Sequence, residues 1–541
     1  MQRPLGAQIS HMLKARGVDV IFGIPGVHNQ EMYRGIEEAG ITHVLARHEQ
    51  GAGFMADGYA RATGRPGVAY VITGPGLCNI MTPMGQAYSD SVPVLVISSC
   101  LGDTVSEQGQ LHQMRDQEAA AATVSDWSET ARTPHAAYQL IDRALAEFQL
   151  DRPRTKHISV TIPALEAQAP PPPLVPVTTI GKPYIRQTEL HECARLLTRA
   201  RQPLIIVGGG HRGSGIMIER VAEQTGAAIF TTYAGRGLIR DDHPLYFGAS
   251  LARSSSADII AQADLVLAAG TELAEVDLWR KDLGHDCPMI RVDLDQTVLS
   301  DRHGASYRYK VDASQFFAAL QHETKDATPA VRWRADAVAA QRAAWRAEVE
   351  VERPGIASVC DALRAALPDK TMIYSDMTQF AYTAKEVWPM AHPHHWHHPS
   401  GFGTLGYAVP AAIGGAVARR DRPTLAIIGD YGFHYTMAEL GVAVELGLPL
   451  PIILWDNGKL KEIEDSMTRA QIAPNAVIAR NPDFCKLAEA FGAYTAAPAS
   501  LQEMQEAVRT AFAADGPTLI YLTPGIMERA APSAAHAPSS G

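Results

Sequence analysis

Two polar residues that each follow an apolar segment, Asp430 and Asn457, have the chemistry of magnesium ligands. Each stands in a glycine-containing turn and offers a side-chain oxygen, the donor that hard cations prefer. A magnesium ion held there can bind a diphosphate, with the carbonyl of Lys459 as a third oxygen ligand and the backbone N–H groups of Tyr431 and Gly432 around the phosphates. The other interpretation is two unrelated turns, in which Asp and Asn are common for conformational reasons.

A second chemical candidate is Glu49, an acid beside His48 at the start of the small-residue stretch "EQGAGFMADGYARATG". We expect a short strand over residues 42–45 and then a tightly packed helix, so this carboxylate stands where ionisation is costly. The residue is either a functional acid or a helix-start acid favoured by the helix dipole. The segment alone leaves both interpretations open.

These residues must be positioned by strands and helices, which the sequence predicts in alternation. Short β-branched apolar runs such as "GVAYVIT", "PLIIVGGG" and "TLAIIGD" alternate with alanine-rich helical stretches throughout the chain. Fully apolar strands separated by helices are typical of parallel sheets covered on both faces. The pattern predicts an α/β protein with three doubly wound parallel-sheet domains, in which ligands bind beyond the carboxyl ends of the strands.

Two proline-containing segments divide the chain. Four consecutive prolines in "EAQAPPPPLVP" predict a stiff extended connector, and the polar "QHETKDATPA" leads into a long helix that ends near Pro354. The predicted domains are therefore 1–165, 184–325 and 355–530. The tail, 531–541, is small, polar and proline-rich and is predicted to be disordered.

Composition excludes several classes of protein. The 541 residues are 46% hydrophobic and carry a formal charge of -10, which argues against a nucleic-acid partner. No segment has the length of a signal peptide or a membrane span, so we expect no membrane partner and a cytoplasmic location. The six cysteines form no C-x-x-C pair and are predicted to be reduced thiols.

Four motifs carry a resemblance to a known family. "RHEQGAGFMADGYARATG", "TGPGLCN", "SGFGTLGYAVPAAIGG" and the pair "GDYG" and "DNG" are similar to enzymes that bind thiamine diphosphate through magnesium, of the acetolactate synthase and 2-oxoacid decarboxylase branch. The resemblance implies a pyrimidine-binding domain, a central Rossmann-like domain and a diphosphate-binding domain. It also implies active sites formed between chains, hence at least a homodimer and an expected homotetramer.

The resemblance also implies roles for individual residues. Glu49 matches the glutamate that bonds N1′ of the aminopyrimidine and promotes removal of the thiazolium C2 proton. Leu405 matches the bulky residue that bends the cofactor, while the carbonyl of Gly403 and the N–H of Leu405 bond the pyrimidine. Gln379 matches a diphosphate contact, and Asn79, which ends "TGPGLCN", is expected to contact the cofactor.

Three further segments give weaker indications of function. The run "GGGHRG" (208–213) fits G-x-G-x-x-G after a strand, but no acid stands near the next strand end to bind a ribose. The segment "GTELAEVD" lacks the arginine-containing pattern of flavin-dependent acetolactate synthases, so FAD is not expected. The histidine run "HPHHWHHP" has no flanking cysteines, and we interpret it as a loop at the active-site entrance rather than a metal site.

The reaction type is predicted from the positions at which this chain differs from other members of the family. Pyruvate-type decarboxylases carry acids where this chain has Val27 and Ile463, and acetolactate synthases have a tryptophan in the second of these segments that is absent here. The candidates for proton handling are His112, Gln113 and His28, although His112 can also be a packed core histidine. A decarboxylase and a carboligase that condenses two 2-oxoacids both stay open; a catalytically silent homologue is disfavoured by the intact cofactor motifs.

The substrate is predicted from the helix that follows Asn457. Together with "FGIPGVHN" and "QLHQMRDQ", this helix most resembles the 5-guanidino-2-oxopentanoate decarboxylases, which give 4-guanidinobutanal and CO2. It offers Glu462 and Asp465 three residues apart on one face, and a guanidinium prefers a carboxylate partner. The alternative is that the acids of this helix pair with Lys459 and Lys461 on its surface.

Overall fold

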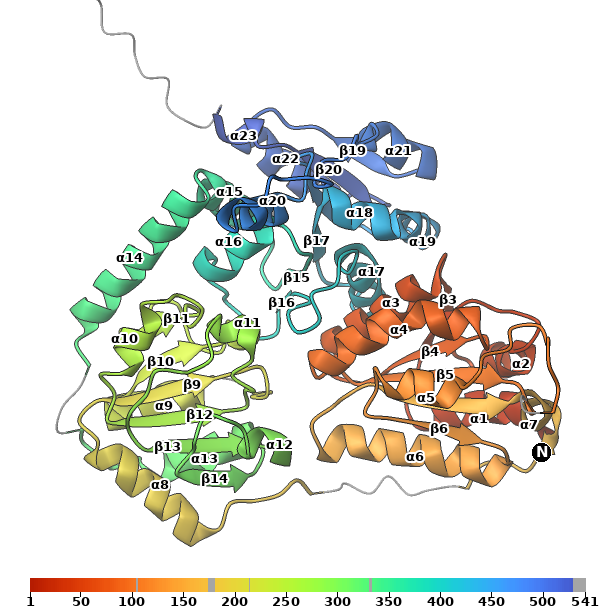
Figure 1. The fold of residues 1–541 in the computed structure, drawn as a ribbon, viewed down its shortest axis with the longest axis horizontal. Helices are drawn as coiled ribbons and strands as arrows, with labels where there is room; N and C mark the ends of the chain where they lie inside the picture. Colours follow the sequence, from red (N-terminus) through yellow and green to blue (C-terminus); the bar gives the residue numbers. More distant parts are fainter. Residues whose placement is uncertain (104–105, 174–180, 214, 330–332, 529–541) are drawn as a thin grey trace, which may run out of the picture.

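The computed structural model describes residues 1–103, 106–173, 181–213, 215–329 and 333–528. These residues form three separate six-stranded sheets, each of them parallel throughout and accompanied by helices (Figure 1). The three doubly wound α/β units predicted from the apolar runs are thereby confirmed. The predicted tail, 531–541, lies outside the described residues.

The first sheet has the strand order β3-β2-β4-β5-β7-β6. Its strands are β2 (Val20–Gly23), β3 (Thr42–Leu45), β4 (Gly67–Val71), β5 (Val94–Cys100), β6 (Trp127–Ala131) and β7 (Lys156–Thr161). Its helices are α1 (Leu5–Ala15), α2 (Gln30–Glu38), α3 (Glu49–Thr63), α4 (Pro75–Ser89), α5 (Gln117–Ala122), α6 (Pro134–Leu150) and α7 (Ile162–Glu166). A small antiparallel pair, β1 (Arg3–Pro4) with β8 (Gln168–Ala169), joins the two ends of this unit.

The central sheet has the order β11-β10-β9-β12-β13-β14. Its strands are β9 (Pro203–Val207), β10 (Ala228–Thr231), β11 (Tyr246–Gly248), β12 (Leu265–Ala269), β13 (Met289–Asp293) and β14 (Tyr307–Lys310). Its helices are α8 (Gln187–Arg199), α9 (Ile216–Thr225), η1 (Tyr233–Gly235), α10 (Ser256–Ile260), α11 (Glu275–Leu278), α12 (Gln296–Leu299) and α13 (Ala313–Glu323). This is the strand order of the Rossmann fold, with its switch point between β9 and β12.

The third sheet has the order β16-β15-β17-β18-β20-β19 and follows the long connecting helix α14 (Ala335–Glu352). Its strands are β15 (Met372–Ser375), β16 (Trp396–His397), β17 (Thr424–Gly429), β18 (Pro451–Trp455), β19 (Tyr494–Ala496) and β20 (Thr518–Leu522). Its helices are α15 (Ile356–Ala366), α16 (Gln379–Val387), α17 (Ala408–Ala418), α18 (Asp430–Thr436), η2 (Met437–Glu439), α19 (Leu440–Glu445), α20 (Lys461–Arg469), α21 (Phe484–Phe491), α22 (Leu501–Phe512) and α23 (Gly525–Glu528).

The first and third sheets share one topology. In both, the chain runs from the first strand to an edge partner and then crosses to the other side, so the switch points lie between β2 and β4 and between β15 and β17. Ligands bind beyond the carboxyl ends of the strands at such points. Glu49 and Asp430 both begin helices that start beyond these ends.

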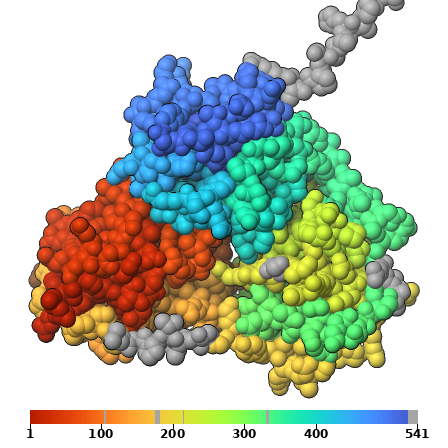
Figure 2. All heavy atoms as spheres, turned by 180° about the vertical axis from the view of Figure 1, so that it is seen from behind, coloured from red at the N-terminus to blue at the C-terminus, as the bar shows by residue number. Residues whose placement is uncertain are grey.

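The first and third units pack together through α3 and α17. A Cβ atom on Gly58 would lie 1.9 Å from the carbonyl oxygen of Ala411, and one on Gly414 would lie 1.9 Å from that of Met55. The two helices therefore touch backbone to backbone, and one continuous hydrophobic cluster spans both units. From behind, Figure 2 shows the third unit resting on the first and central units.

Two further observations concern the cysteines and membrane-spanning segments. All six cysteines are free thiols. Within the described ranges, no helix combines the length and the apolar character needed to cross a membrane.

Candidate active site

The first half of the candidate site gathers around the N-terminus of α4. Glu49 is the first residue of α3 and is 9% exposed, and the side-chain amide of Asn79 donates a 2.9 Å hydrogen bond to its Oε2. A Cβ atom on Gly76 would lie 3.3 Å from Glu49 Oε1, so the bare backbone of α4 lets the carboxylate approach. The sequence thus correctly places Glu49 at a helix start, and the structure adds a specific partner, Asn79.

A second buried acid holds the chain just before Glu49. Glu439, from η2 of the third unit, accepts hydrogen bonds from the backbone N–H groups of Arg47 (3.1 Å) and His48 (2.9 Å). A Cβ atom on Gly51 would lie 2.2 Å from Glu439 Oε1, so glycine is needed there. Burial raises the pKa of Glu439 to about 7, the two backbone N–H groups and Arg47 oppose the rise, and the charge of Glu49 adds to it.

Two of the three proton-handling candidates, His28 and His112, contact one another beside the N-terminus of α4. The rings of His28 and His112 pack edge to face with centroids 5.1 Å apart. His112 has a φ of +64°, and its carbonyl oxygen would lie 2.5 Å from a Cβ atom on Gly74, the residue that caps α4. Burial, and then the neighbouring His112, lower the pKa of His28.

The third candidate, Gln113, faces its own loop instead. Its side-chain oxygen accepts from the N–H of Gln110 (3.2 Å) and its amide donates to the carbonyl of Glu107 (2.8 Å). The structure therefore places His28 and His112 in contact, whereas the side chain of Gln113 forms hydrogen bonds within its own segment, residues 107–113. A catalytic role for Gln113 stays a prediction.

The second half of the candidate site lies at the carboxyl ends of β17 and β18. Asp430 and Asp456 share one partner, because the amide of Asn481 donates to Asp430 (2.7 Å) and to Asp456 (2.9 Å). Burial raises the pKa of Asp430, the Asn481 hydrogen bond opposes this, and the charge of Asp456 adds to the rise. Two converging carboxylates with this mutual repulsion suit a bound cation.

Asn457 links the predicted magnesium site to Glu462, one of the predicted substrate residues. Its side-chain amide donates to Gln379 Oε1 (3.3 Å), and the amide of Gln379 donates to Glu462 Oε1 (3.3 Å). Asn457 Oδ1 accepts from the N–H of Lys459 (3.3 Å), which folds the turn back on itself. The predicted contacts Gln379, Asn457, Lys459 and Glu462 therefore form one continuous set.

The phosphate turn and the predicted cofactor-bending loop lie over the end of β15. A Cβ atom on Gly432 would lie 3.1 Å from the carboxyl carbon of Asp376, so the first turn of α18, which also includes Tyr431, sits close to the strand end. Gly403 has a φ of +69°, and a Cβ atom there would lie 3.6 Å from Met377. Leu405 is half-buried two residues later.

The acids of α20 divide between the two interpretations drawn from the sequence. Asp465 pairs with Lys461, and Glu464 pairs with both Lys459 (3.1 Å) and Lys461 (3.4 Å), as the surface-pair alternative expects. Glu462 instead turns toward Gln379. Of the two predicted substrate acids, only Glu462 contacts the cofactor candidates, and a substrate role for Asp465 stays a prediction.

Within one chain, Glu49 and the loop that carries Leu405 contact different parts of α4. Glu49 meets its N-terminal end at Asn79, whereas Gly401 donates to Asp90 (2.8 Å) and Thr404 to Gln86 (3.1 Å) at the other end. At 1.5 Å per residue, the positions of Asn79 and Gln86 are roughly 10 Å apart along the helix. Glu49 and the loop that carries Leu405 are therefore anchored at different points along α4.

The glycine run of the central unit is explained by packing. Gly208 and Gly210 follow β9 at the switch point, and Cβ atoms on them would lie 2.4 Å and 2.8 Å from the backbone of Gly270 after β12. These glycines allow two strand ends to touch. The motif alone therefore does not identify a nucleotide site.

The imidazoles of the histidine run have separate partners. His392 contacts Asp369 (2.8 Å), His394 contacts the carbonyl of His211 (3.0 Å) and His398 contacts Ser375 (3.0 Å). In the described ranges, no group of three or more His, Cys, Asp or Glu side chains is arranged as a metal site. The magnesium ligands predicted above include only one acid, Asp430, and so do not depend on such a group.

Sequence reasoning missed the residues that support the site from a distance. Asp456 adjoins Asn457 and had a local signal, an acid at a strand end. Asn481 and Glu439 had none, because they reach their partners only through the fold. Gln117 was also missed: its side-chain oxygen accepts from Thr73 (2.8 Å), just before α4.

Comparison with known proteins decides the family. Three profiles of the thiamine pyrophosphate enzymes match the chain: the N-terminal TPP binding domain over residues 3–120, the central domain over 190–320 and the C-terminal TPP binding domain over 376–522. The chain belongs to the thiamine pyrophosphate enzyme family. Each profile matches one of the three sheets, and the two TPP binding domains coincide with the two half-sites described above.

Curated relatives in the family cover nearly the whole chain. The probable 2-ketoarginine decarboxylase AruI of Pseudomonas aeruginosa is 42% identical over 96% of this chain and 93% of its own length. The acetolactate synthase isozyme 2 large subunit of Escherichia coli is 27% identical over 96% and 95%. An acetolactate synthase of Mycobacterium bovis is 29% identical over 91% and 83%.

Proposed function

We propose that this thiamine pyrophosphate enzyme is a 2-oxoacid decarboxylase that converts 2-ketoarginine (5-guanidino-2-oxopentanoate) and a proton into 4-guanidinobutanal and CO2. The observation that carries the proposal is the unbroken contact from Asn457 through Gln379 to Glu462. It puts the Glu462 carboxylate next to the predicted diphosphate contact. The 42% identity to a probable 2-ketoarginine decarboxylase supports the same substrate.

The chain's own residues suit the cofactor and a magnesium ion. Asp430, Asn457 and the carbonyl of Lys459 would hold the ion, and the bare backbone at Gly432 would admit the phosphates. Thiamine diphosphate, when bound, supplies the carbon nucleophile and the electron sink that 2-oxoacid decarboxylation needs. Magnesium has support in the paired carboxylates Asp430 and Asp456, whose repulsion a cation relieves.

Two sets of side chains would handle protons. Glu49 can exchange a proton with the pyrimidine of the cofactor, since Asn79 fixes its position. His28 is kept neutral near pH 7 by its lowered pKa, so it can take up and return a proton. Its ring packs against that of His112, the second candidate for proton handling, while His112 as a purely packed residue is the competing interpretation.

Glu462 already receives a guanidinium in this structure. Arg353, at the end of α14, places its Nε 3.4 Å from Glu462 Oε1. The carboxylate is therefore accessible to the planar group that the substrate carries, and its side chain is 33% exposed. We infer that the substrate guanidinium takes the place of Arg353 at Glu462, because a charge-assisted, two-point contact is the preferred geometry for this pair.

Product analysis of the magnesium- and cofactor-loaded enzyme tests the proposal. With 2-ketoarginine we expect CO2 and 4-guanidinobutanal in equal amounts, and with pyruvate little turnover. The alternative is a carboligase of the acetolactate synthase type, which would make acetolactate from pyruvate. A wild-type preference for pyruvate would overturn the substrate assignment and leave the family unaffected.

A pair of isosteric variants tests the role of Glu462. Glu462→Gln should lower kcat/KM for 2-ketoarginine by about 10- to 200-fold, the value of a charge-assisted hydrogen bond, and far less for an uncharged oxoacid of equal length. Glu464→Gln is the matched control on the same helix, since Glu464 pairs with lysines. Equal losses for both substrates would contradict the assignment, and so would equal effects of the two substitutions.

We also propose that two copies of the chain complete each active site. Apolar side chains beside both half-sites are exposed in the single chain, including Val27 at 65%, Leu111 at 62% and Phe402 at 50%. Such exposure marks an interaction surface. A dimer that pairs the Glu49 half of one copy with the Asp430 half of the other would bury it, and a tetramer made of two such dimers is the expected assembly.

A further inference from the structure

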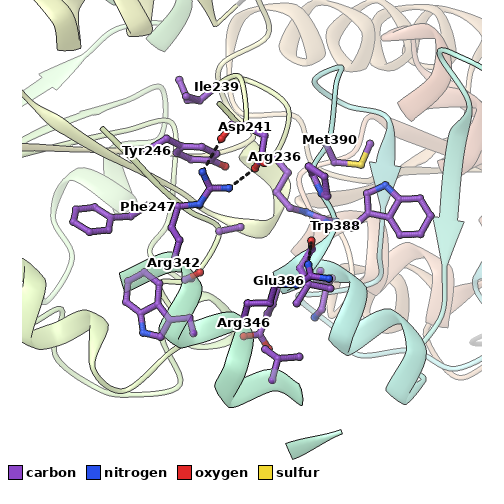
Figure 3. A pocket seen from close by; sticks show the side chains of 18 of the residues that line it. Arg236, Ile239, Asp241, Tyr246, Phe247, Arg342, Arg346, Glu386, Trp388 and Met390 are labelled. Carbon is purple, nitrogen blue, oxygen red and sulfur yellow. Dashed lines mark hydrogen bonds and ion pairs between the residues drawn. The ribbon is translucent and has the colours of Figure 1, made fainter. Parts of the chain in front are cut away.

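A cavity of about 600 Å³ lies where the central sheet, the connecting helix and the third sheet meet. Its walls come from residues 236–250 of the central unit, from α14, and from the helices α15 and α16 with the segment that follows. In Figure 3, Arg342 reaches from α14 toward Asp241, while Trp388 and Met390 of the third unit stand on the other side. None of the residues assigned above to the cofactor or the substrate lines it.

The lining is cationic. Five basic side chains face three acids, Asp241, Asp361 and Glu386. Each acid is already matched: Asp241 by Arg342 (2.5 Å), Asp361 by Arg346 (2.5 Å), and Glu386 by an arginine outside the cavity wall. Because no acid remains unpaired, the remaining lining cations give the cavity a positive surplus.

Three lining cations form no salt bridge among the described residues, although the charges of Glu386 and Asp277 act on one of them, Lys385. Lys385 makes neither a hydrogen bond nor a salt bridge there, and its ammonium lies 4.4 Å from the ring centre of Tyr233. Arg364 is exposed at the end of α15 and likewise has no ion pair in the described chain. Arg236 is buried and donates only to the carbonyls of Tyr233 (3.2 Å) and Ala384 (3.3 Å).

The electrostatic state of two of these groups reflects their burial. Burial lowers the pKa of Lys385 to about 8, the charge of Arg236 lowers it further, and the charges of Glu386 and Asp277 oppose this. Burial also lowers the pKa of Arg236 to about 10. A bound anion would favour the charged form of both groups, because opposite charge opposes desolvation.

The rest of the wall is apolar. Ile239, Val349, Trp388, Pro389 and Met390 line it together with several alanines. A site of this volume, apolar over much of its surface with a few convergent charges, is typical of small-molecule binding sites. Its cations match carboxylates and phosphates, and its apolar walls match a carbon skeleton between or beside them.

We propose that this cavity binds a small organic dianion and thereby bridges the central unit, α14 and the third unit. Arg364, Lys385 and Arg236 supply the charge from two of these bodies. A ligand there would hold α16 against the central unit, and α16 begins at Gln379, the predicted diphosphate contact. The site is therefore placed to influence the active site without sharing a residue with it.

Binding is tested on the enzyme saturated with thiamine diphosphate and magnesium, so that the cofactor site is closed to the probes. The probes are glutarate, inorganic pyrophosphate and ADP, which separate a dicarboxylate from a bare phosphate and from a phosphate with a large apolar body. Calorimetry should give a Kd below about 1 mM for glutarate or ADP, weakening with added salt. Binding of pyrophosphate alone would show a site for an inorganic anion and overturn the assignment of an organic ligand. A matching rise in Tm is expected, since the ligand binds the folded state. Absence of binding by all three probes would overturn the proposal.

Two variants locate the site. Arg364→Gln and Lys385→Gln should each weaken the binding probe by about 10-fold or more, the effect of losing one charge-assisted contact. Arg420→Gln, an exposed arginine of the third unit away from the cavity wall, is the control and should bind as wild type does. Arg364 is at the surface, so its variant should fold even if the Lys385 variant does not. Unchanged affinity in Arg364→Gln would place the ligand elsewhere and overturn the proposal.

Discussion

Glu49 is held from two sides: Asn79 donates to one carboxylate oxygen, and Glu439 fixes the backbone just before it. Replacing Glu49 by Gln keeps this shape and removes only the acid. We expect normal folding and cofactor affinity, with exchange of the C2 proton of bound thiamine diphosphate slowed by about 10²- to 10⁴-fold, the contribution of a positioned acid. Quenched-flow H/D exchange read by NMR measures this rate. An unchanged rate would show that Glu49 is structural.

The raised pKa of Glu439 predicts a pH dependence of stability. The folded state holds the Glu439 proton up to about pH 7, whereas an unfolded glutamate loses it near pH 4.5. The folded chain therefore binds more protons in this window, and the free energy of unfolding falls as pH rises through it. Arg47 and Glu49 face the group and have opposite effects on it. The Tm of Glu439→Gln relative to wild type should increase between about pH 5 and pH 8; a constant difference would contradict this.

At the scale of residues, the sequence allowed predictions from the chemistry of side chains. It gave no signal for residues that reach their partners only in the folded protein. Asp430 and Asn457 stand at strand ends, and their type and position were enough to propose them as ligands. Asn481 binds Asp430 across 51 residues and Glu439 binds His48 across 391, so no local pattern announces either. The sequence showed that Glu462 and Asp465 share a face; only the structure separates their partners.

At the scale of elements, the contact between α3 and α17 fixes the first unit to the third. Gly58→Ala would place a methyl group 1.9 Å from the carbonyl oxygen of Ala411, so one helix must move. We expect a loss of about 3 kcal/mol, the upper end of overpacking effects, seen as a lower Tm of the transition that involves these units. Gly181→Ala is the control: no atom of the described residues lies within 4 Å of a Cβ at this position, and the change should stay within about 0.5 kcal/mol. Equal stability of the two variants would show that this contact yields easily.

Strands and helices were predictable here because each carries its own signal. The apolar runs predicted the sheets, and the strand at 42–45 matches β3. The loop with Gly403 and Leu405 was recognised only by resemblance. Its place depends on Asp90 and Gln86, more than 300 residues away in the chain, and such anchoring is a property of packing.

At the scale of the whole molecule, the proposed pairing of two copies at each active site makes a prediction about assembly. If each site combines Glu49 of one copy with Asp430 of another, a copy defective in one residue can still complete a site with a copy defective in the other. Glu49→Gln and Asp430→Ala enzymes should each be nearly inactive alone.

Coexpressed in equal amounts and purified together through two different tags, the two variants should recover activity. Random pairing makes half of the dimers mixed, and each mixed dimer has one intact site and one site with both substitutions. About a quarter of the wild-type activity is therefore expected in the unfractionated mixture, and about half in the doubly purified mixed dimer. The control is the same mixture made from separately folded variants, measured at once, which stays inactive if copies exchange slowly. If the site lay within one chain, every chain in the mixture would be defective and no activity would return, because Glu49 and Asp430 would then have to work in the same copy.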